Sequence, residues 1–165
     1  NEHMSESYSH LYRIPQTGLR FFTVYGPWGR PDMAVWKFTE AILRGNPIAL
    51  YNGGKMRRDF TYVGDVAPAV LACLDRPPAP ETGSPHRIYN IGNSKSEELM
   101  RLLALIEEAC GRKALTVPHP RPPEDLTDTF ADIGAARADF GYAPVTSIDE
   151  GVPEFVRWYR EFHAL

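Results

Sequence analysis

Apolar positions along the chain follow two periods in turn, which predicts an alternation of helices and strands. Apolar side chains spaced three and four residues apart predict helices at 4–12, 33–44, 66–74, 99–110 and 152–162, with a shorter one after Asp132. Short apolar runs between them predict strands at 19–25, 48–51, 60–63, 87–92 and 115–117. Because the two kinds of element take turns, the pattern favours an α/β fold.

Residues flanking the periodic segments predict where some of the helices begin. Ser94 with Glu97, and Ser147 with Glu150, have the spacing of capping boxes. Asp65 is the expected N-cap of the helix at 66–74. These caps place helix starts near residues 65, 95 and 148.

The run at 19–25 is the most apolar of the predicted strands. It has little polar alternation and ends at Gly26-Pro27. A strand of this composition is typical of a parallel sheet, where both faces are covered. We therefore expect residues 19–25 to form one strand that is buried on both sides.

Composition narrows the class of protein. The 165 residues are 43% hydrophobic and 24% charged, which is enough apolar material for a core and argues against disorder. A net charge of −3 gives no field for nucleic acid or an anionic membrane, and no apolar run reaches the roughly 18 residues of a membrane span. Cys73 and Cys110 lie on apolar helical faces, so we expect buried thiols and a cytoplasmic, reducing location.

Common catalytic and metal motifs are missing from the sequence. It has no Gly-rich phosphate loop, no His-Glu-x-x-His and no Cys-x-x-Cys, and its five histidines lack ligand spacing, so no metal is expected. Tyr51 and Lys55 have the Tyr-x-x-x-Lys spacing of a proton-transfer pair. That chemistry needs both side chains on one helical face, whereas Asn52-Gly53-Gly54 predicts a turn. We therefore reject this pair as catalytic.

Two groups of basic residues have a structural and a functional interpretation. Lys55, Arg57 and Arg58 follow the turn and precede Asp59. They form either a solvated hairpin end with an Arg–Asp pair or an arginine presented to a diphosphate. Arg30 is either an ordinary loop arginine or a clamp for a carboxylate at the end of a parallel strand.

Several blocks of sequence resemble the extended short-chain dehydrogenase/reductase family, that is, the NAD-dependent epimerases and dehydratases, and within it the UDP-glucuronate 4-epimerases. The matching blocks span almost the whole chain in the family's order: 19–27, 30–33, 51–63, 89–93 and the stretch from Asp125 to Asp132. The resemblance implies the C-terminal part of a Rossmann-type parallel sheet plus a smaller substrate-binding lobe. Residues 1–27 and 60–112 would be Rossmann elements, and residues 28–59 and 113–165 mainly the lobe and terminal helices.

The resemblance also implies that the chain is the C-terminal half of such an enzyme. The family's Gly-rich NAD loop and its Tyr-x-x-x-Lys pair would then precede Asn1, and no catalytic residue is expected within these 165 residues. NAD is the implied cofactor of the intact protein, and the chain alone is expected to be inactive.

The first group of implied site residues surrounds the reacting sugar. Phe22 matches a position that lines the nicotinamide. Thr23 matches a position that contacts the sugar or diphosphate, and its hydroxyl suits a uronate carboxylate. Arg30 is the candidate carboxylate clamp.

The second group is implied to hold the UDP part of a UDP-sugar. Ala49, Leu50 and Tyr51 match the segment that holds the uracil, with Tyr51 as an aromatic platform. Arg58 matches the arginine that binds the diphosphate. Arg121 matches a second phosphate-binding arginine, in a register that Pro122-Pro123 leaves open by one residue.

Three other interpretations remain open from the sequence. The intact protein could be another nucleotide-sugar epimerase, dehydratase or decarboxylase. The chain could be a module that binds a UDP-sugar and catalyses nothing. The chain could also be a domain-swapped or oligomeric scaffold, because the helix at 1–12 has an apolar face formed by Met4, Tyr8, Leu11 and Tyr12. A homodimer through this helix is expected.

Overall fold

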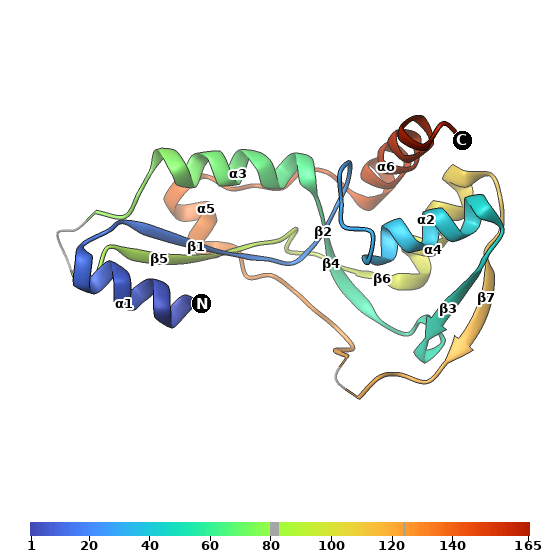
Figure 1. Cartoon of the computed structure of the whole chain (residues 1–165), viewed down its shortest axis with the longest axis horizontal. Coiled ribbons are helices and arrows are strands. Elements are labelled where there is room, and N and C mark those ends of the chain that lie inside the picture. Colours follow the sequence, from blue (N-terminus) through green and yellow to red (C-terminus); the bar gives the residue numbers. More distant parts are fainter. Residues whose placement is uncertain (80–82, 124) are drawn as a thin grey trace.

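The computed structural model describes residues 1–79, 83–123 and 125–165 and shows an α/β arrangement (Figure 1). Its helices are α1 (Glu2–Tyr12), α2 (Ala34–Arg44), α3 (Val63–Asp75), α4 (Leu99–Cys110), α5 (Gly134–Phe140) and α6 (Ile148–His163). Its strands are β1 (Gln16–Phe21), β2 (Thr23–Tyr25), β3 (Pro47–Tyr51), β4 (Arg57–Tyr62), β5 (His86–Ile91), β6 (Ser96–Glu98) and β7 (Leu115–His119), with a 3₁₀ turn η1 at Asn52–Gly54. The expected fold class is confirmed.

One end of the molecule is a parallel strand pair covered by helices on both faces (Figure 1). Strands β1 and β5 pair in register from Gln16↔His86 to Phe21↔Ile91. Helix α1 lies on one face of this pair, and α3 and α5 lie on the other. This layered order is the one that parallel strands require, because their crossover helices cover the sheet.

The other end of the molecule is built from helices α2, α4 and α6 and two short sheets. Strand β4 pairs in parallel with β2 and antiparallel with β6, whereas β3 pairs in parallel with β7. Helices α2, α4 and α6 pack against one another beside these strands. The first cavity described below lies between α2, β3 and β4.

Buried side chains form two clusters that follow these two ends. One joins α2, β3, α4 and α6, and its most deeply buried members are Leu102, Ile106, Val152 and Tyr159. The other joins α3, β5, α5 and the segment at 131–133. Helix α4 packs with α2 and α6, and α5 packs on β5. The division into a Rossmann part and a lobe at the predicted boundaries stays a prediction.

The predicted strand at 19–25 is two strands, with Phe22 between them. The chain changes partner there: β1 pairs with β5, whereas β2 pairs with β4, and the Phe22 N–H donates to the Ile91 carbonyl at 3.2 Å. The expectation of burial on both faces is wrong for this chain, since the Phe21 side chain is 52% exposed.

Two predicted helix starts are also wrong. Glu97 lies in β6 and its buried carboxylate pairs with Lys95 at 2.7 Å, so α4 begins at Leu99 instead of from a Ser94 cap. Helix α3 begins at Val63, and Asp65 accepts a hydrogen bond from the Thr146 N–H at 3.0 Å. Asp65 is taken by a tertiary contact, and Glu97 is drawn into β6 by the pairing of this strand with β4, where it lies opposite Arg58.

The capping box of the last helix is confirmed. Glu150 accepts hydrogen bonds from the Ser147 N–H at 3.0 Å and from its hydroxyl at 2.8 Å. These bonds hold the pKa of the Glu150 carboxyl below its usual value. Helix α6 therefore starts where the sequence predicts it.

Three further findings concern cysteines, membranes and metals. Cys73 and Cys110 are buried free thiols. No helix in the described ranges is long and apolar enough to cross a membrane. Among the same residues, no cluster of histidine, cysteine or acidic side chains is placed to hold a metal ion.

Candidate functional site

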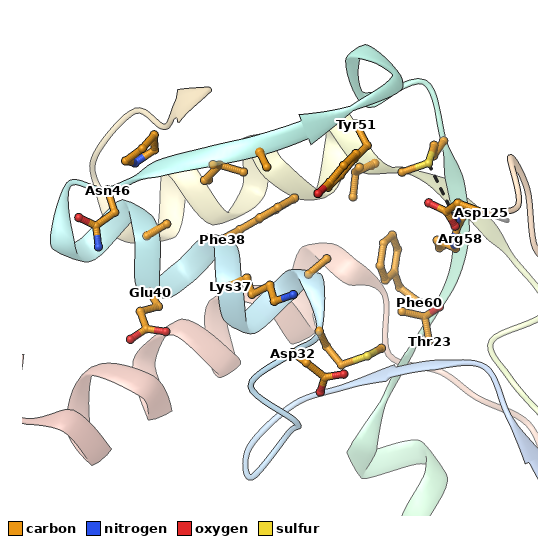
Figure 2. Close-up of a pocket in the computed structure, with 18 residues that line it drawn as sticks. Thr23, Asp32, Lys37, Phe38, Glu40, Asn46, Tyr51, Arg58, Phe60 and Asp125 are labelled. Carbon is orange, nitrogen blue, oxygen red and sulfur yellow. Dashed lines mark hydrogen bonds and ion pairs between the residues drawn. The ribbon is translucent and has the colours of Figure 1, made fainter. Parts of the chain in front are cut away.

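A cavity of about 700 Å³ lies between α2, β3 and β4 (Figure 2). Four of the predicted site residues line it: Thr23, Ala49, Tyr51 and Arg58. They come from three different strands, β2, β3 and β4, so the fold brings residues from separate parts of the sequence to one cavity. The remaining predicted residues, which are Phe22, Arg30, Leu50 and Arg121, lie outside its wall.

Strand β3 presents alternate side chains to the core and away from it. Ile48 and Leu50 are buried, whereas Ala49 and Tyr51 lie on the open side. The Leu50 side chain is therefore part of the core, and only its backbone is available to a ligand. The Tyr51 ring is 41% exposed, and its centroid lies 5.4 Å from that of His119 on β7.

Arg58 enters the cavity from β4 and is held there by Asp125. Its Nη2 lies 2.6 Å from Asp125 Oδ1, and its Nη1 donates to the Arg57 carbonyl at 2.8 Å. The Arg58 side chain is only 16% exposed. Arg121 lies outside the cavity, yet its Nη1 donates to the backbone carbonyl of Asp125 at 2.8 Å. The two predicted phosphate-binding arginines thus meet at one residue.

Asp59, the next residue along β4, does not line the cavity but holds the segments behind it in place, which the sequence did not reveal. It is fully buried and accepts hydrogen bonds from Thr61 Oγ1, the Asn93 N–H and the Ala131 N–H at 3.0, 2.6 and 3.0 Å. The interpretation of Asp59 as part of a solvated hairpin end is therefore wrong. The signal available was the alternation of β4, in which residues 58 and 59 must face opposite sides.

Two more of the predicted site residues line a second cavity of about 380 Å³. Phe22 and Arg30 line it together with apolar side chains such as Val24, Val63 and Val66. Met33 and Thr23 mark its border with the first cavity. Met33 lines both, and Thr23 lines the first while its neighbours on either side line the second.

Arg30 forms a two-contact ion pair with Asp32 in the loop before α2. Arg30 Nε lies 3.0 Å from Asp32 Oδ1, and Nη2 lies 2.5 Å from Oδ2. The shared hydrogen bonds raise the pKa of the Arg30 guanidinium and lower the pKa of the Asp32 carboxyl. Asp32 itself lines the first cavity, so the pair lies where the two cavities meet.

Helix α2 adds polar side chains that the sequence did not single out. Lys37 and Glu40 project from α2 at the edge of the first cavity, and Asn46 closes its far end (Figure 2). Lys37 from α2 and Arg58 from β4 are the two cations among the described residues that line this cavity. From the sequence alone, a lysine near the start of an amphipathic helix is expected to be a solvated surface residue. Only the fold shows that Lys37 borders a cavity.

The rejected pair, Tyr51 and Lys55, is not arranged for proton transfer. Tyr51 ends β3 and Lys55 follows the 3₁₀ turn at Asn52–Gly54, so the two do not share a helical face. Among the residues that the structure describes, the charged side chains that line the first cavity are two cations, Lys37 and Arg58, and three carboxylates, Asp32, Glu40 and Asp125. The second cavity adds Arg30 to a largely apolar wall.

Known proteins that are similar to this chain belong to the family that its sequence blocks resemble. The sequence profile of the NAD dependent epimerase/dehydratase family matches residues 1–92. A probable UDP-glucuronate 4-epimerase of Rhizobium meliloti is 43% identical over 171 residues, which cover 96% of this chain and 50% of that relative. The chain spans about half the length of the curated relatives it matches.

Two solved structures share the fold closely. MoeE5 in complex with UDP-glucuronic acid and NAD superposes with a TM-score of 0.88 at 29% identity, over 98% of this chain and 53% of that one. UDP-glucuronic acid 4-epimerase from Bacillus cereus in complex with UDP-glucuronic acid and NAD gives 0.87 at 28% identity, over 98% and 50%. The mixed α/β architecture is therefore that of the Rossmann-like epimerases.

Proposed function

The chain belongs to the NAD dependent epimerase/dehydratase family, and we propose that it forms the UDP-sugar-binding part of a nucleotide-sugar epimerase. The proposed reaction of the intact protein is the interconversion of UDP-glucuronate and UDP-galacturonate through a 4-keto sugar. The observation that carries this proposal is the first cavity, in which the half-buried Arg58 lies with Thr23 and Tyr51. Relatives and solved structures named for UDP-glucuronate support the choice of substrate.

In this proposal the UDP part of the substrate occupies the first cavity. The diphosphate binds Arg58, where a guanidinium fork matches phosphate oxygens and gives up its contact with Asp125. The uracil lies along the open side of β3, over Tyr51 and against the backbone of Ala49 and Leu50. Arg121 joins the diphosphate from the loop at Asp125.

The sugar then reaches the border of the two cavities. Thr23 lies at that border, and Arg30 and Asp32 flank it from the loop. A uronate carboxylate placed there replaces Asp32 as the partner of Arg30, which keeps a bidentate pair in both states. This exchange is our explanation for a preference for uronates.

The second cavity fits the nicotinamide end of NAD. Its wall is largely apolar, with Phe22 and Val24 on the sheet side, and it adjoins the sugar position at Met33. Bound NAD supplies a reversible hydride acceptor for C4 of the sugar. Phe22 would then orient and shield the nicotinamide ring, and we assign no proton-transfer residue to this chain.

We also propose a homodimer and a reducing, cytoplasmic location. Met4, Tyr8, Leu11 and Tyr12 on α1 are all more than half exposed, which leaves an apolar face free for a second copy. The support for the location is that Cys73 and Cys110 are both free thiols, which a reducing compartment maintains.

The experiment that tests the function is turnover by the intact protein. UDP-glucuronate with NAD should give UDP-galacturonate by ¹H NMR, and UDP-glucose should be converted far less efficiently. Arg30→Ala should reduce the preference for the uronate by about tenfold, because one charge-assisted contact is lost. The 165-residue chain alone should bind UDP and convert neither sugar.

The alternatives give different results in the same assay. Loss of carbon dioxide or of water from UDP-glucuronate would identify a decarboxylase or a dehydratase instead. Binding of UDP-sugar by the intact protein without any conversion would identify a non-catalytic module. Equal turnover of the two sugars would remove the role of Arg30.

A further inference from the structure

The loop that carries Arg30 contains a backbone conformation that is unfavourable for its residue. The Gly29 N–H donates to the Gly26 carbonyl at 3.0 Å, with Pro27 second and Trp28 third in the turn. Trp28 has φ of +63°. This is the pattern of a type II turn, whose third position ordinarily holds glycine or asparagine. A bulky tryptophan there is strained, and such strain persists only where other contacts compensate for it.

Aromatic side chains of α6 supply those contacts. The Trp28 ring centroid lies 5.0 Å from that of Phe162 and 5.5 Å from that of Trp158. Trp158 and Phe162 stack on one another at 5.2 Å, and Trp158 also meets Trp36 of α2 at 5.7 Å. The exposed Trp28 is therefore joined through two rings to the buried core of α6.

At the start of the loop Gly26 packs closely against Val63 of α3, whereas the polar bonds of the loop are local. In the described part of the chain, the hydrogen bonds and ion pairs of residues 26–32 stay within 26–33: Gly29 to Gly26, Met33 to Arg30, and Arg30 to Asp32. Trp28 thus joins the loop to another element by side-chain ring contacts, two residues before Arg30. The Arg30 side chain is 76% exposed and has no tertiary partner of its own among these bonds.

We propose that Trp28 is a positioning residue that holds Arg30 at the border of the two cavities and so sets the preference for a uronate. Its ring is 75% exposed and lies against Phe162 and Trp158 of α6, a contact that we call the clamp. This inference rests on the proposed role of Arg30 in carboxylate recognition. Trp28 acts through the turn at residues 26–29. While its ring stays on α6, the backbone after the turn keeps one direction, and Arg30 keeps one position. Without the clamp, the strained turn relaxes and Arg30 samples positions from which it misses the carboxylate.

The test compares the affinities of UDP-glucuronate and UDP-glucose for the intact protein by titration calorimetry. Phe162→Ala removes one side of the clamp and lies outside both cavities. It should weaken UDP-glucuronate binding by about fivefold and leave UDP-glucose binding unchanged, because only the carboxylate contact depends on Arg30. Phe162→Tyr keeps the ring and should keep the wild-type ratio. Trp28 also lines the second cavity, so its own variant is read beside Phe162→Ala: Trp28→Ala removes the ring but keeps a side chain at the positive φ, so the turn should relax and the ratio of the two affinities should fall as well.

Arg30→Ala, measured in parallel, separates the two levels of the argument. If Arg30→Ala lowers the ratio while Phe162→Ala and Trp28→Ala leave it unchanged, the clamp has no positioning role and the carboxylate assignment stands. If Phe162→Ala weakens both ligands equally, the clamp serves stability alone and the inference is overturned. If Arg30→Ala leaves the ratio unchanged, the carboxylate assignment itself fails, and the positioning role fails with it.

Discussion

Strand β4 and the loop at 26–33 each present one arginine to the candidate site, and they hold it in opposite ways. Arg58 on β4 is 16% exposed, and its partner Asp125 lies 67 residues further along the chain. Arg30 in the loop is 76% exposed, and its partner Asp32 lies two residues away. The polar partner of one arginine comes from a distant segment, and that of the other comes from its own loop.

This difference matches what each arginine is proposed to recognise. A diphosphate is common to all nucleotide-sugars, and a fixed Arg58 binds it with little loss of side-chain entropy. The substituent at C5 of the sugar varies between substrates, and a loop can change there without disturbing the core. The comparison predicts that changes at β4 affect folding and all ligands, whereas changes in the loop affect selectivity.

The largest effect is expected for Asp59→Ala, at the buried face of β4. The substitution leaves three donors without an acceptor: Thr61 Oγ1, the Asn93 N–H and the Ala131 N–H. Because buried hydrogen bonds to a charged acceptor are lost, the free energy of unfolding should fall by about 3 kcal/mol in urea denaturation of the 165-residue chain.

Asp32→Ala is the matched change in the loop. It also removes an aspartate carboxylate, but this one is held by an exposed ion pair with Arg30, so the denaturation midpoint should hardly move. If the two variants are equally stable, β4 is not the fixed element that its hydrogen bonds indicate, and the comparison fails.

The next effect concerns binding of UDP itself. Arg58→Ala should weaken the affinity for UDP by about tenfold or more, since a half-buried, charge-assisted contact with phosphate is removed. Its neighbour provides the control: Arg57 contacts Glu98 and the Ser96 carbonyl and does not line the first cavity. Arg57→Ala removes the same charge one position away and should change the affinity for UDP by less than about threefold. Similar losses in both variants would mean that general charge, and not the placement of Arg58, attracts the ligand.

Much of the fold follows from the sequence because local signals and tertiary structure agree there. The helix at 33–44, the strand at 48–51 and the capping box at Ser147 come out as periodicity and cap chemistry predict. Resemblance to a family placed Thr23, Ala49, Tyr51 and Arg58, and the structure gathers these four around one cavity. Their roles as ligand contacts stay predictions.

The remaining features depend on contacts between distant segments, which a single sequence does not record. The strand at 19–25 divides because β1 and β2 have different partners, and Glu97 leaves its predicted cap to enter β6. Asp59 looks like an ordinary polar residue beside two arginines until residues 93 and 131 are placed around it. The exchangeable pair of Arg30 and Asp32 is likewise a property of loop geometry.

The smallest effect is a change in the titration of Asp32, and it tests the exchange of carboxylates directly. The hydrogen bond from Arg30 lowers the pKa of this carboxyl below its ordinary value of 3.8. The contribution of the pair to stability is thus complete above about pH 4 and is lost as the pH falls through the lowered pKa. In ¹³C NMR, with Asp32→Asn used for assignment, Arg30→Ala should return the pKa of Asp32 toward 3.8. Saturation with UDP-glucuronate should raise it in the same direction, because the substrate carboxylate takes the guanidinium, whereas UDP-glucose should leave it low. If the pKa of Asp32 stays low when UDP-glucuronate is saturating, Arg30 keeps Asp32 as its partner in the complex. The loop would then be as fixed as β4.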